Sequence, residues 1–196
     1  MKKVMYLSLV LVMFLGLFSS SFSLLQLKGV YTGYAKGSGI GLGVDFPLIP
    51  FIPTCLYVTG LPDTNVSLPS LSMGGINFSA GTAKFKTMTF ELQTMFPLDI
   101  AGVGVGGSLV MDWLSADLLG KSASFPGNIY GGVVGNYKQN IIPLVDWFAQ
   151  VGFLVKLWDV EKVIKDANSS IPANLINLSD LDRSGLFYRV GVSIGL

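Results

Sequence analysis

The chain has no histidine and only one cysteine, and both shortages limit its chemistry. Histidine is the commonest general base, and none of the many serines has another recognisable base beside it. Cys55 alone cannot form an intramolecular disulfide, and no His/Cys cluster exists for zinc. We therefore expect no catalytic residues, no metal ligands and no cofactor, so the chain is predicted not to be an enzyme.

Charge is also scarce. Only 13% of the residues are charged, whereas an ordinary soluble domain has roughly a quarter. The net charge of +1 leaves no basic surface for nucleic acid and no acidic tail. Beyond the N-terminus no long apolar helix stands out, because the best candidate, residues 141–158, contains Pro143, Asp146 and Lys156.

What is present begins with a secretory signal peptide at residues 1–23. A basic head (residues 1–3) precedes an apolar run (residues 4–18) and a serine-rich stretch suited to cleavage (residues 19–23). An uncleaved anchor is the alternative, but the run is shorter than the ~20 residues of a spanning helix. Residues 24–196 then form one domain.

That domain consists mostly of segments in which large apolar residues alternate with small or polar ones, which is the period of a strand. A helix is the alternative for residues 146–158, and a short amphipathic helix is predicted from Val160, Val163, Ile164 and Ala167. A proline-rich stretch, residues 47–53, should break the sheet, and residues 61–81, 114–127 and 161–185 are predicted loops. The eight predicted strands are residues 25–35, 39–46, 54–60, 84–96, 102–113, 128–137, 146–158 and 186–196.

Eight strands, short turns on one side and long loops on the other are typical of a transmembrane barrel. A sheet in hydrocarbon cannot leave an edge unpaired, so it must close. The predicted fold is therefore all-β, an eight-stranded antiparallel up-and-down transmembrane β-barrel, with a short helix in the last outer loop.

The last strand, residues 186–196, alternates most strictly. Its apolar residues should face lipid: Tyr188, Val190, Val192, Ile194 and Leu196. Aromatic residues near the predicted strand ends should form girdles at the two membrane interfaces: Trp113, Trp147, Trp158, Tyr137 and Tyr188.

On this pattern the chain resembles the small outer-membrane β-barrel proteins, the OmpA/OmpX-like group, over roughly residues 24–196. Members commonly end in such an alternating strand, which the barrel-assembly machinery recognises, although they usually finish with Phe or Trp where this chain has Leu196. The resemblance implies a bacterial outer-membrane location after signal-peptide cleavage, with outer-membrane lipid and that machinery as partners and no nucleic acid.

Alternation also places six charges inside the barrel. An eight-stranded barrel is just wide enough for its side chains to fill it, and buried charges must be paired. We expect an ion-pair network plugging the lumen, with Arg189 paired to Asp112. Its members are Lys28, Asp45, Glu91, Asp112, Lys156 and Arg189, the first three toward the inner half and the others toward the outer half.

The sequence is compatible with three functional hypotheses. The first is a structural or surface-contact role in the envelope, with outer loops available to an unknown surface partner. The second is a narrow pore or carrier for small or apolar solutes, lined by Thr87, Thr89, Gln150 and Ser193 without ion pairs. The third is a soluble secreted β-barrel or sandwich that binds a lipid; its core would be formed by Ile40, Leu42, Val103, Val105, Val192 and Ile194.

Overall fold

The computed structural model describes residues 25–49, 52–68, 71–73, 76–78, 81–98, 102–118, 121–161 and 179–195. The predicted signal peptide and Leu196 lie outside these residues, as do Val163, Ile164 and Ala167 of the predicted short helix; Val160 is helical. No helix in the described part of the chain is long and apolar enough to cross a membrane.

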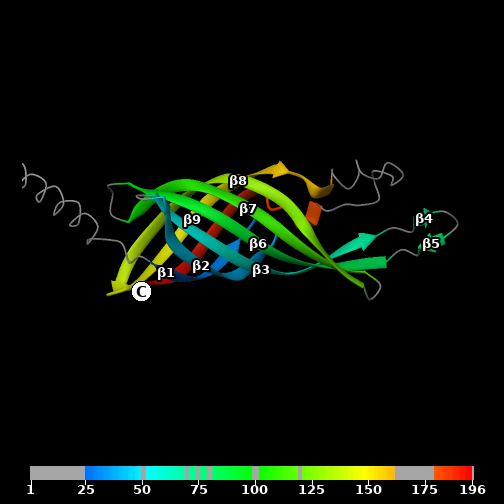
Figure 1. The fold of residues 1–196 in the computed structure, drawn as a ribbon, viewed down its shortest axis with the longest axis horizontal. Helices are drawn as coiled ribbons and strands as arrows, with labels where there is room; N and C mark the ends of the chain where they lie inside the picture. Colours follow the sequence, from blue (N-terminus) through cyan, green and yellow to red (C-terminus); the bar gives the residue numbers. More distant parts are fainter. Residues whose placement is uncertain are drawn as a thin grey trace, which may run out of the picture.

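Eight antiparallel strands close into a barrel in the order β1-β10-β9-β8-β7-β6-β3-β2 (Figure 1). Closure joins the first strand to the last, with Gln26 opposite Gly195 and Gly33 opposite Tyr188. The predicted eight-stranded antiparallel barrel is therefore confirmed. The barrel strands are β1 (Gln26–Gly33), β2 (Ser38–Ile49), β3 (Ile52–Leu68), β6 (Gly81–Pro97), β7 (Val103–Leu118), β8 (Lys121–Ile142), β9 (Val145–Trp158) and β10 (Gly185–Gly195).

Several strands are longer than predicted. Within the predicted loops 61–81 and 114–127, the residues that the structure describes are strands: β3 and β6 continue their pairing to Leu68 and Gly81, and β7 and β8 to Leu118 and Lys121. A small hairpin of β4 (Leu71–Met73) and β5 (Ile76–Phe78) lies between β3 and β6. These polar residues form strands because cross-strand pairing stabilises extended backbone beyond the apolar part of the wall, despite their local preference.

The predicted break at residues 47–53 is also wrong, because Pro47 lies opposite Pro53 and Ile49 opposite Ile52. The register shifts between Pro47 and Ile49. Proline is tolerated at such irregular strand ends because the ladder bond it cannot donate is already lost there. The strand prediction for residues 146–158 is confirmed by β9, and the helical alternative is wrong.

The two ends of the barrel are distinct. We call the end near Gln26 and Gly195 the terminal end, and the end near Gly33 and Gly185 the distal end. The long β3–β6 extension with β4 and β5 projects from the distal end, on the right of Figure 1. Short turns follow β2, β6 and β8 at the terminal end, as predicted. The connection from β7 to β8 at the distal end, predicted to be a long loop, is short as well, because the two strands pair as far as Leu118 and Lys121.

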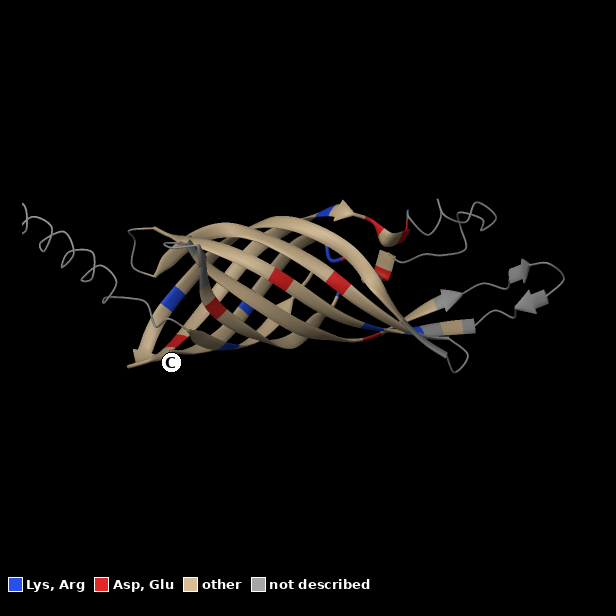
Figure 2. Cartoon of the chain, viewed as in Figure 1, with Lys and Arg blue, Asp and Glu red and all other residues tan. Residues whose placement is uncertain are grey.

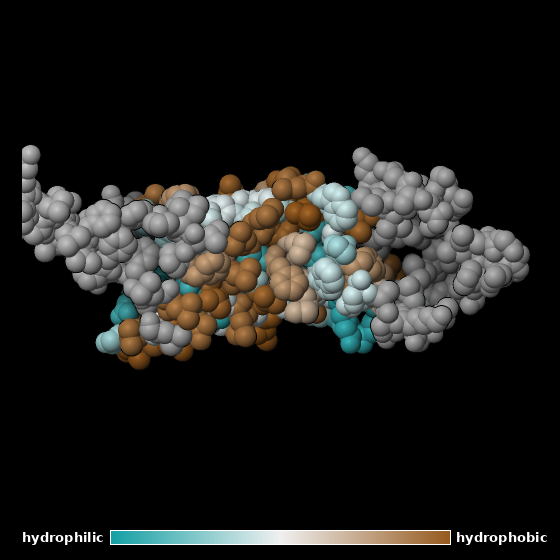
Figure 3. Space-filling model, in the orientation of Figure 1, coloured by the Kyte–Doolittle hydropathy of each residue, from teal (hydrophilic) through white to brown (hydrophobic). Residues whose placement is uncertain are grey.

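The outer surface of the barrel is apolar. Ile40 is 76% exposed and Leu42 72% exposed, although both are large aliphatic residues. Figure 3 shows such hydrophobic residues over much of the barrel wall, with hydrophilic ones toward both ends. A soluble barrel or sandwich needs these side chains inside. The predicted soluble core is wrong, since Ile40, Leu42, Val105, Val192 and Ile194 are exposed.

Exposed aromatic residues mark the height of this apolar surface. Tyr137 and Trp147 contact each other at the terminal end, with ring centroids 5.5 Å apart, and Trp158 ends β9 at the distal end. The eleven steps from Trp147 to Trp158 span about 37 Å at ~3.4 Å per residue. A strand tilt of about 40° reduces this to ~28 Å along the axis, close to the ~25 Å apolar band of outer-membrane barrels.

The interior is filled by three apolar clusters with polar groups between them. A cluster at the terminal end contains Tyr57 and Phe148, one in the middle contains Tyr34 and Phe187, and one at the distal end contains Leu114. Small residues on the inner face make room for large ones. A Cβ atom at Gly43 would lie 2.6 Å from the Tyr57 ring, so only glycine fits there without movement.

Candidate functional site in the barrel interior

Near the terminal end, Lys28 on β1 forms an ion pair with Asp45 on β2. Its Nζ lies 2.8 Å from Asp45 Oδ1 and donates to the Tyr57 hydroxyl at 3.3 Å. The ammonium also lies 4.9 Å from the centre of the Phe148 ring. These contacts replace part of the hydration that an ammonium loses on burial.

The centre of the barrel contains a second ion pair, between Arg189 on β10 and Glu91 on β6. In the closed strand order β10 and β6 are four places apart, so they lie on opposite walls. Their side chains therefore meet across the full width of the lumen. Arg189 is fully buried and Glu91 is 1% exposed. Figure 2 shows how few charged positions the barrel wall contains.

Every polar group of this central pair has further partners. Arg189 donates to Gln150 Oε1 at 3.0 Å and to Thr32 Oγ1 at 2.9 Å, and its guanidinium lies 3.9 Å from the centre of the Tyr57 ring. Glu91 Oε1 accepts from Ser108 Oγ at 2.7 Å. The network thus joins strands from all round the barrel in one polar layer.

The predicted pairing of Arg189 with Asp112 is wrong, since Arg189 contacts Glu91 instead. Glu91 lies opposite Val110 on β7, so Asp112 is two residues further toward the distal end. Alternation shows which side chains point inward, but the tilt and stagger of the strands decide which of them share a level.

Asp112 is buried in the distal half and makes no ion pair within the described part of the chain. Its Oδ2 lies 3.4 Å from the Tyr130 hydroxyl, and its Oδ1 has no hydrogen-bond partner. The same hydroxyl lies 3.3 Å from Leu181 O and accepts from the Arg183 amide at 3.1 Å. Tyr130 therefore connects the barrel wall to the segment that precedes β10.

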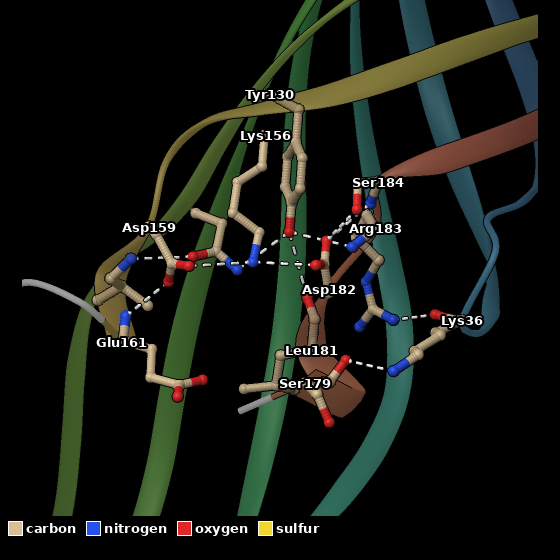
Figure 4. A network of polar contacts seen from close by, with 12 residues as sticks. Lys36, Tyr130, Lys156, Asp159, Glu161, Ser179, Leu181, Asp182, Arg183 and Ser184 are labelled. Atoms are coloured by element: carbon tan, nitrogen blue, oxygen red, sulfur yellow. Dashed lines mark hydrogen bonds and ion pairs between the residues drawn. The ribbon is translucent and has the colours of Figure 1, made fainter. Parts of the chain in front are cut away.

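That segment, residues 179–184, begins with the 3₁₀ turn η1 (Ser179–Leu181) and makes several polar contacts with the distal end of the barrel (Figure 4). We call it the mouth segment. Asp182 pairs with Lys156 at 2.9 Å, Lys36 donates to Ser179 O at 2.7 Å, and Arg183 Nη1 donates to Lys36 O. Leu181 packs in the distal apolar cluster. The mouth segment is thus attached to three parts of the barrel rim.

Asp182 lies outside the strands and is held as a carboxylate. Burial alone would raise its pKa, but hydrogen bonds from Ser184 and the Lys156 ammonium outweigh burial and bring the pKa below its ordinary value. Ser184 N donates to Asp182 Oδ1 at 2.9 Å.

The six residues predicted for the lumen network do not form one network. Lys28 pairs with Asp45 and Glu91 with Arg189, whereas Lys156 pairs with Asp182 and Asp159. Sequence reasoning missed Asp182 and Arg183, which fall in a predicted loop, and Tyr130, whose strand had no assigned faces. Tyr57 also points inward, between the less buried Leu56 and Val58, but all three residues are large and apolar, so their sequence does not distinguish the two faces of β3.

Neither a catalytic nor a metal-binding arrangement stands out among the residues that the structure describes. No group of three or more acidic or sulfur ligands capable of holding a metal was found in that part of the chain. Of the pore-lining residues predicted by the second hypothesis, Gln150 contacts Arg189, and Thr89 contacts Tyr34 at 3.3 Å.

No protein-family model matches the chain, and no curated protein matches it. Among solved structures, the N-terminal barrel domain of Pseudomonas aeruginosa OprF is 9% identical, with a TM-score of 0.48 over 87% of this chain and 95% of that one. Neisserial surface protein A is 15% identical, with a TM-score of 0.45 over 88% and 94%. A major outer membrane protein from Thermus thermophilus is 13% identical, with a TM-score of 0.46 over 87% and 98%.

Small outer-membrane barrels are thus what the chain resembles, as the sequence pattern indicates. The likenesses are too distant to transfer any activity, substrate or partner.

Proposed function

We propose that the chain is a non-enzymatic integral protein of the bacterial outer membrane, with its lumen closed by side chains and its distal end available for surface contacts. The observation that supports this most is its reversed polarity. Aliphatic residues such as Ile40 are exposed on the wall, while Arg189 and Glu91 are buried inside. In water this arrangement would be unstable, but in a bilayer both sets of residues are in suitable surroundings.

The closing strand fits this role. Tyr188, Val190, Val192 and Ile194 lie exposed on the outer face of β10, where lipid would cover them. In the proposed orientation the terminal end is periplasmic, and β10 would present its alternating residues to the barrel-assembly machinery before closure with β1.

Closure of the lumen is supported at more than one level. The Arg189–Glu91 pair crosses the barrel at its centre. The Tyr57 and Phe148 cluster lies on one side of this pair, and the cluster with Tyr34 and Phe187 lies on the other. Removing the ion pair alone would therefore leave apolar barriers on both sides.

Two experiments test the proposal. After expression with its signal peptide, the protein should remain with outer membranes during alkaline carbonate extraction and dissolve only in detergent. Recovery in the soluble periplasmic fraction would refute membrane integration.

In planar bilayers, the purified protein and the double variant Glu91→Ala/Arg189→Ala should both show no stable channel conductance. Steady conductance steps from the unmodified protein would refute the closed lumen and favour a narrow pore. Steps from the double variant alone would mean that the ion pair is the only barrier.

A further inference from the structure

The chain has only two arginines, and both are buried, but their surroundings differ sharply. Arg189 is paired with Glu91, and its Nε donates to Thr32. Arg183 is 2% exposed and makes no ion pair with any described carboxylate. Burial of a guanidinium without a counter-charge is costly, so a second partner is expected for Arg183.

One edge of the Arg183 guanidinium makes no hydrogen bond to a described residue. Nη1 donates to Lys36 O and the backbone amide donates to Tyr130, so both ends of the residue are anchored. Nε is buried without a hydrogen-bond partner, and Nη2 donates to no described residue. The Nε and Nη2 groups of an arginine present two parallel N–H donors, the geometry that binds a carboxylate or phosphate through two oxygens.

Arg183 lines a cavity of about 390 Å³ at the distal mouth. The cavity lies between the β1–β2 turn, the mouth segment and β3 at Leu61, where β3 extends beyond its last partner on β2, Ile40 opposite Gly60.

The acidic residues around the cavity already have cations of their own. Asp63 Oδ2 lies 2.6 Å from Lys84 Nζ, and Asp180 lies 3.9 Å from Lys36. Lys36, which also lines the cavity, is close enough to add positive charge. Arg183 is consequently the buried cation at this cavity whose charge no described side chain neutralises by contact.

We propose that the distal cavity is a binding site for an oxoanion, a phosphate or carboxylate group, held by the Nε–Nη2 edge of Arg183 with Lys36 beside it. The site does not depend on the membrane role proposed above. The alternative occupant of the free edge is water that links Arg183 to Asp112, whose Oδ1 is also unpartnered.

Nuclear magnetic resonance of the ¹⁵N-labelled protein in uncharged maltoside micelles tests this directly, since only two arginine Nε–H signals exist. Inorganic phosphate, and separately acetate, should shift the Arg183 signal saturably, while the Arg189 signal stays in place as an internal control. Arg183→Lys keeps the charge but loses the two-donor edge. This variant should raise the dissociation constant for phosphate, measured from the shift of the Gly37 amide signal, about tenfold or more.

Lipid nanodiscs without added phosphate separate the two sources of the oxoanion. A shifted Arg183 signal there identifies a lipid head group, and a shift only after phosphate is added identifies a free ion. The proposal is overturned if neither anion moves the Arg183 signal at tens of millimolar. It is also overturned if Asp112→Asn moves that signal without any anion present, because Asp112 would then already be the partner of Arg183.

Discussion

Replacing Glu91 with alanine should destabilise the protein more than any other single removal of a carboxylate. The change leaves the Arg189 guanidinium in the centre of the barrel without its counter-charge, because no other described carboxylate contacts it. Arg189 cannot move to water, since it is fully buried between apolar clusters. Ser108, which donates to Glu91 at 2.7 Å, also loses its acceptor.

The expected cost follows from the burial of both partners. Breaking a buried pair by removing one member costs about 3–5 kcal/mol, a large part of the ~5–15 kcal/mol that stabilises a typical protein. The matched control is Asp63→Ala, which breaks the Asp63–Lys84 pair, whose side chains are 36% and 55% exposed. Such an exposed pair contributes little to stability, because water screens both charges.

The assay is urea unfolding of the protein folded into lipid vesicles, followed by the fluorescence of its three tryptophans. Free energies of unfolding are compared for the unmodified chain, Glu91→Ala, Asp63→Ala and the pair Glu91→Leu/Arg189→Met. The last variant buries no charge and should recover part of the loss. If Glu91→Ala lowers the free energy of unfolding no more than Asp63→Ala does, the ion pair between Arg189 and Glu91 does not stabilise the barrel as a buried contact.

Three further predictions concern other parts of the molecule. Val190→Arg, on the exposed face of β10, should lower the free energy of unfolding in vesicles by about 2–4 kcal/mol. The control Leu144→Arg, at the terminal turn, should leave it nearly unchanged. Equal losses for the two variants would mean that β10 does not face lipid. Leu144→Gly should raise the free energy of unfolding by about 1 kcal/mol, because Leu144 has a φ of 68°; a loss of stability in the same urea assay would contradict this. Asp182 has a lowered folded-state pKa, so its stabilising contacts are complete above the unfolded pKa of ~3.9 and are lost as the pH falls through the lower folded value. The Ser184 amide resonance should titrate with a midpoint below that of an unperturbed aspartate, and a midpoint at or above it would show that Lys156 and Ser184 do not hold Asp182 ionised.

The alternation of side chains was enough to predict the fold and the inward position of the charges. Ile40, Leu42 and their counterparts on β10 repeat at period two, and in the closed barrel they lie outside. The same pattern could not predict where strands end. Residues 61–81 contain prolines, serines and asparagines, and local preference favours a loop, yet pairing continues to Leu68. Strand ends depend on the neighbouring strand as much as on local preference.

The ion-pair partners inside the barrel could not be predicted from the sequence for a related reason. Arg189 and Glu91 are 98 residues apart and meet only because β10 and β6 face each other across the closed sheet. Asp112 has the same chemistry as Glu91 and also points inward, but it lies two residues further along β7 toward the distal end. The contacts of the mouth segment were even less predictable from the sequence, since Asp182 and Arg183 belong to a stretch with no strand pattern at all.

The sequence by itself therefore determined that this chain forms a closed barrel with an apolar outside and a charged inside, because two-residue periodicity and the shortage of charge are properties of the chain alone. Only the tertiary structure decided which charges meet, that Arg189 crosses the lumen to Glu91, and that Arg183 lines a cavity with no described carboxylate in contact with it. Those outcomes depend on the stagger between strands and on how the mouth segment folds back over the barrel, and neither is encoded by a local pattern.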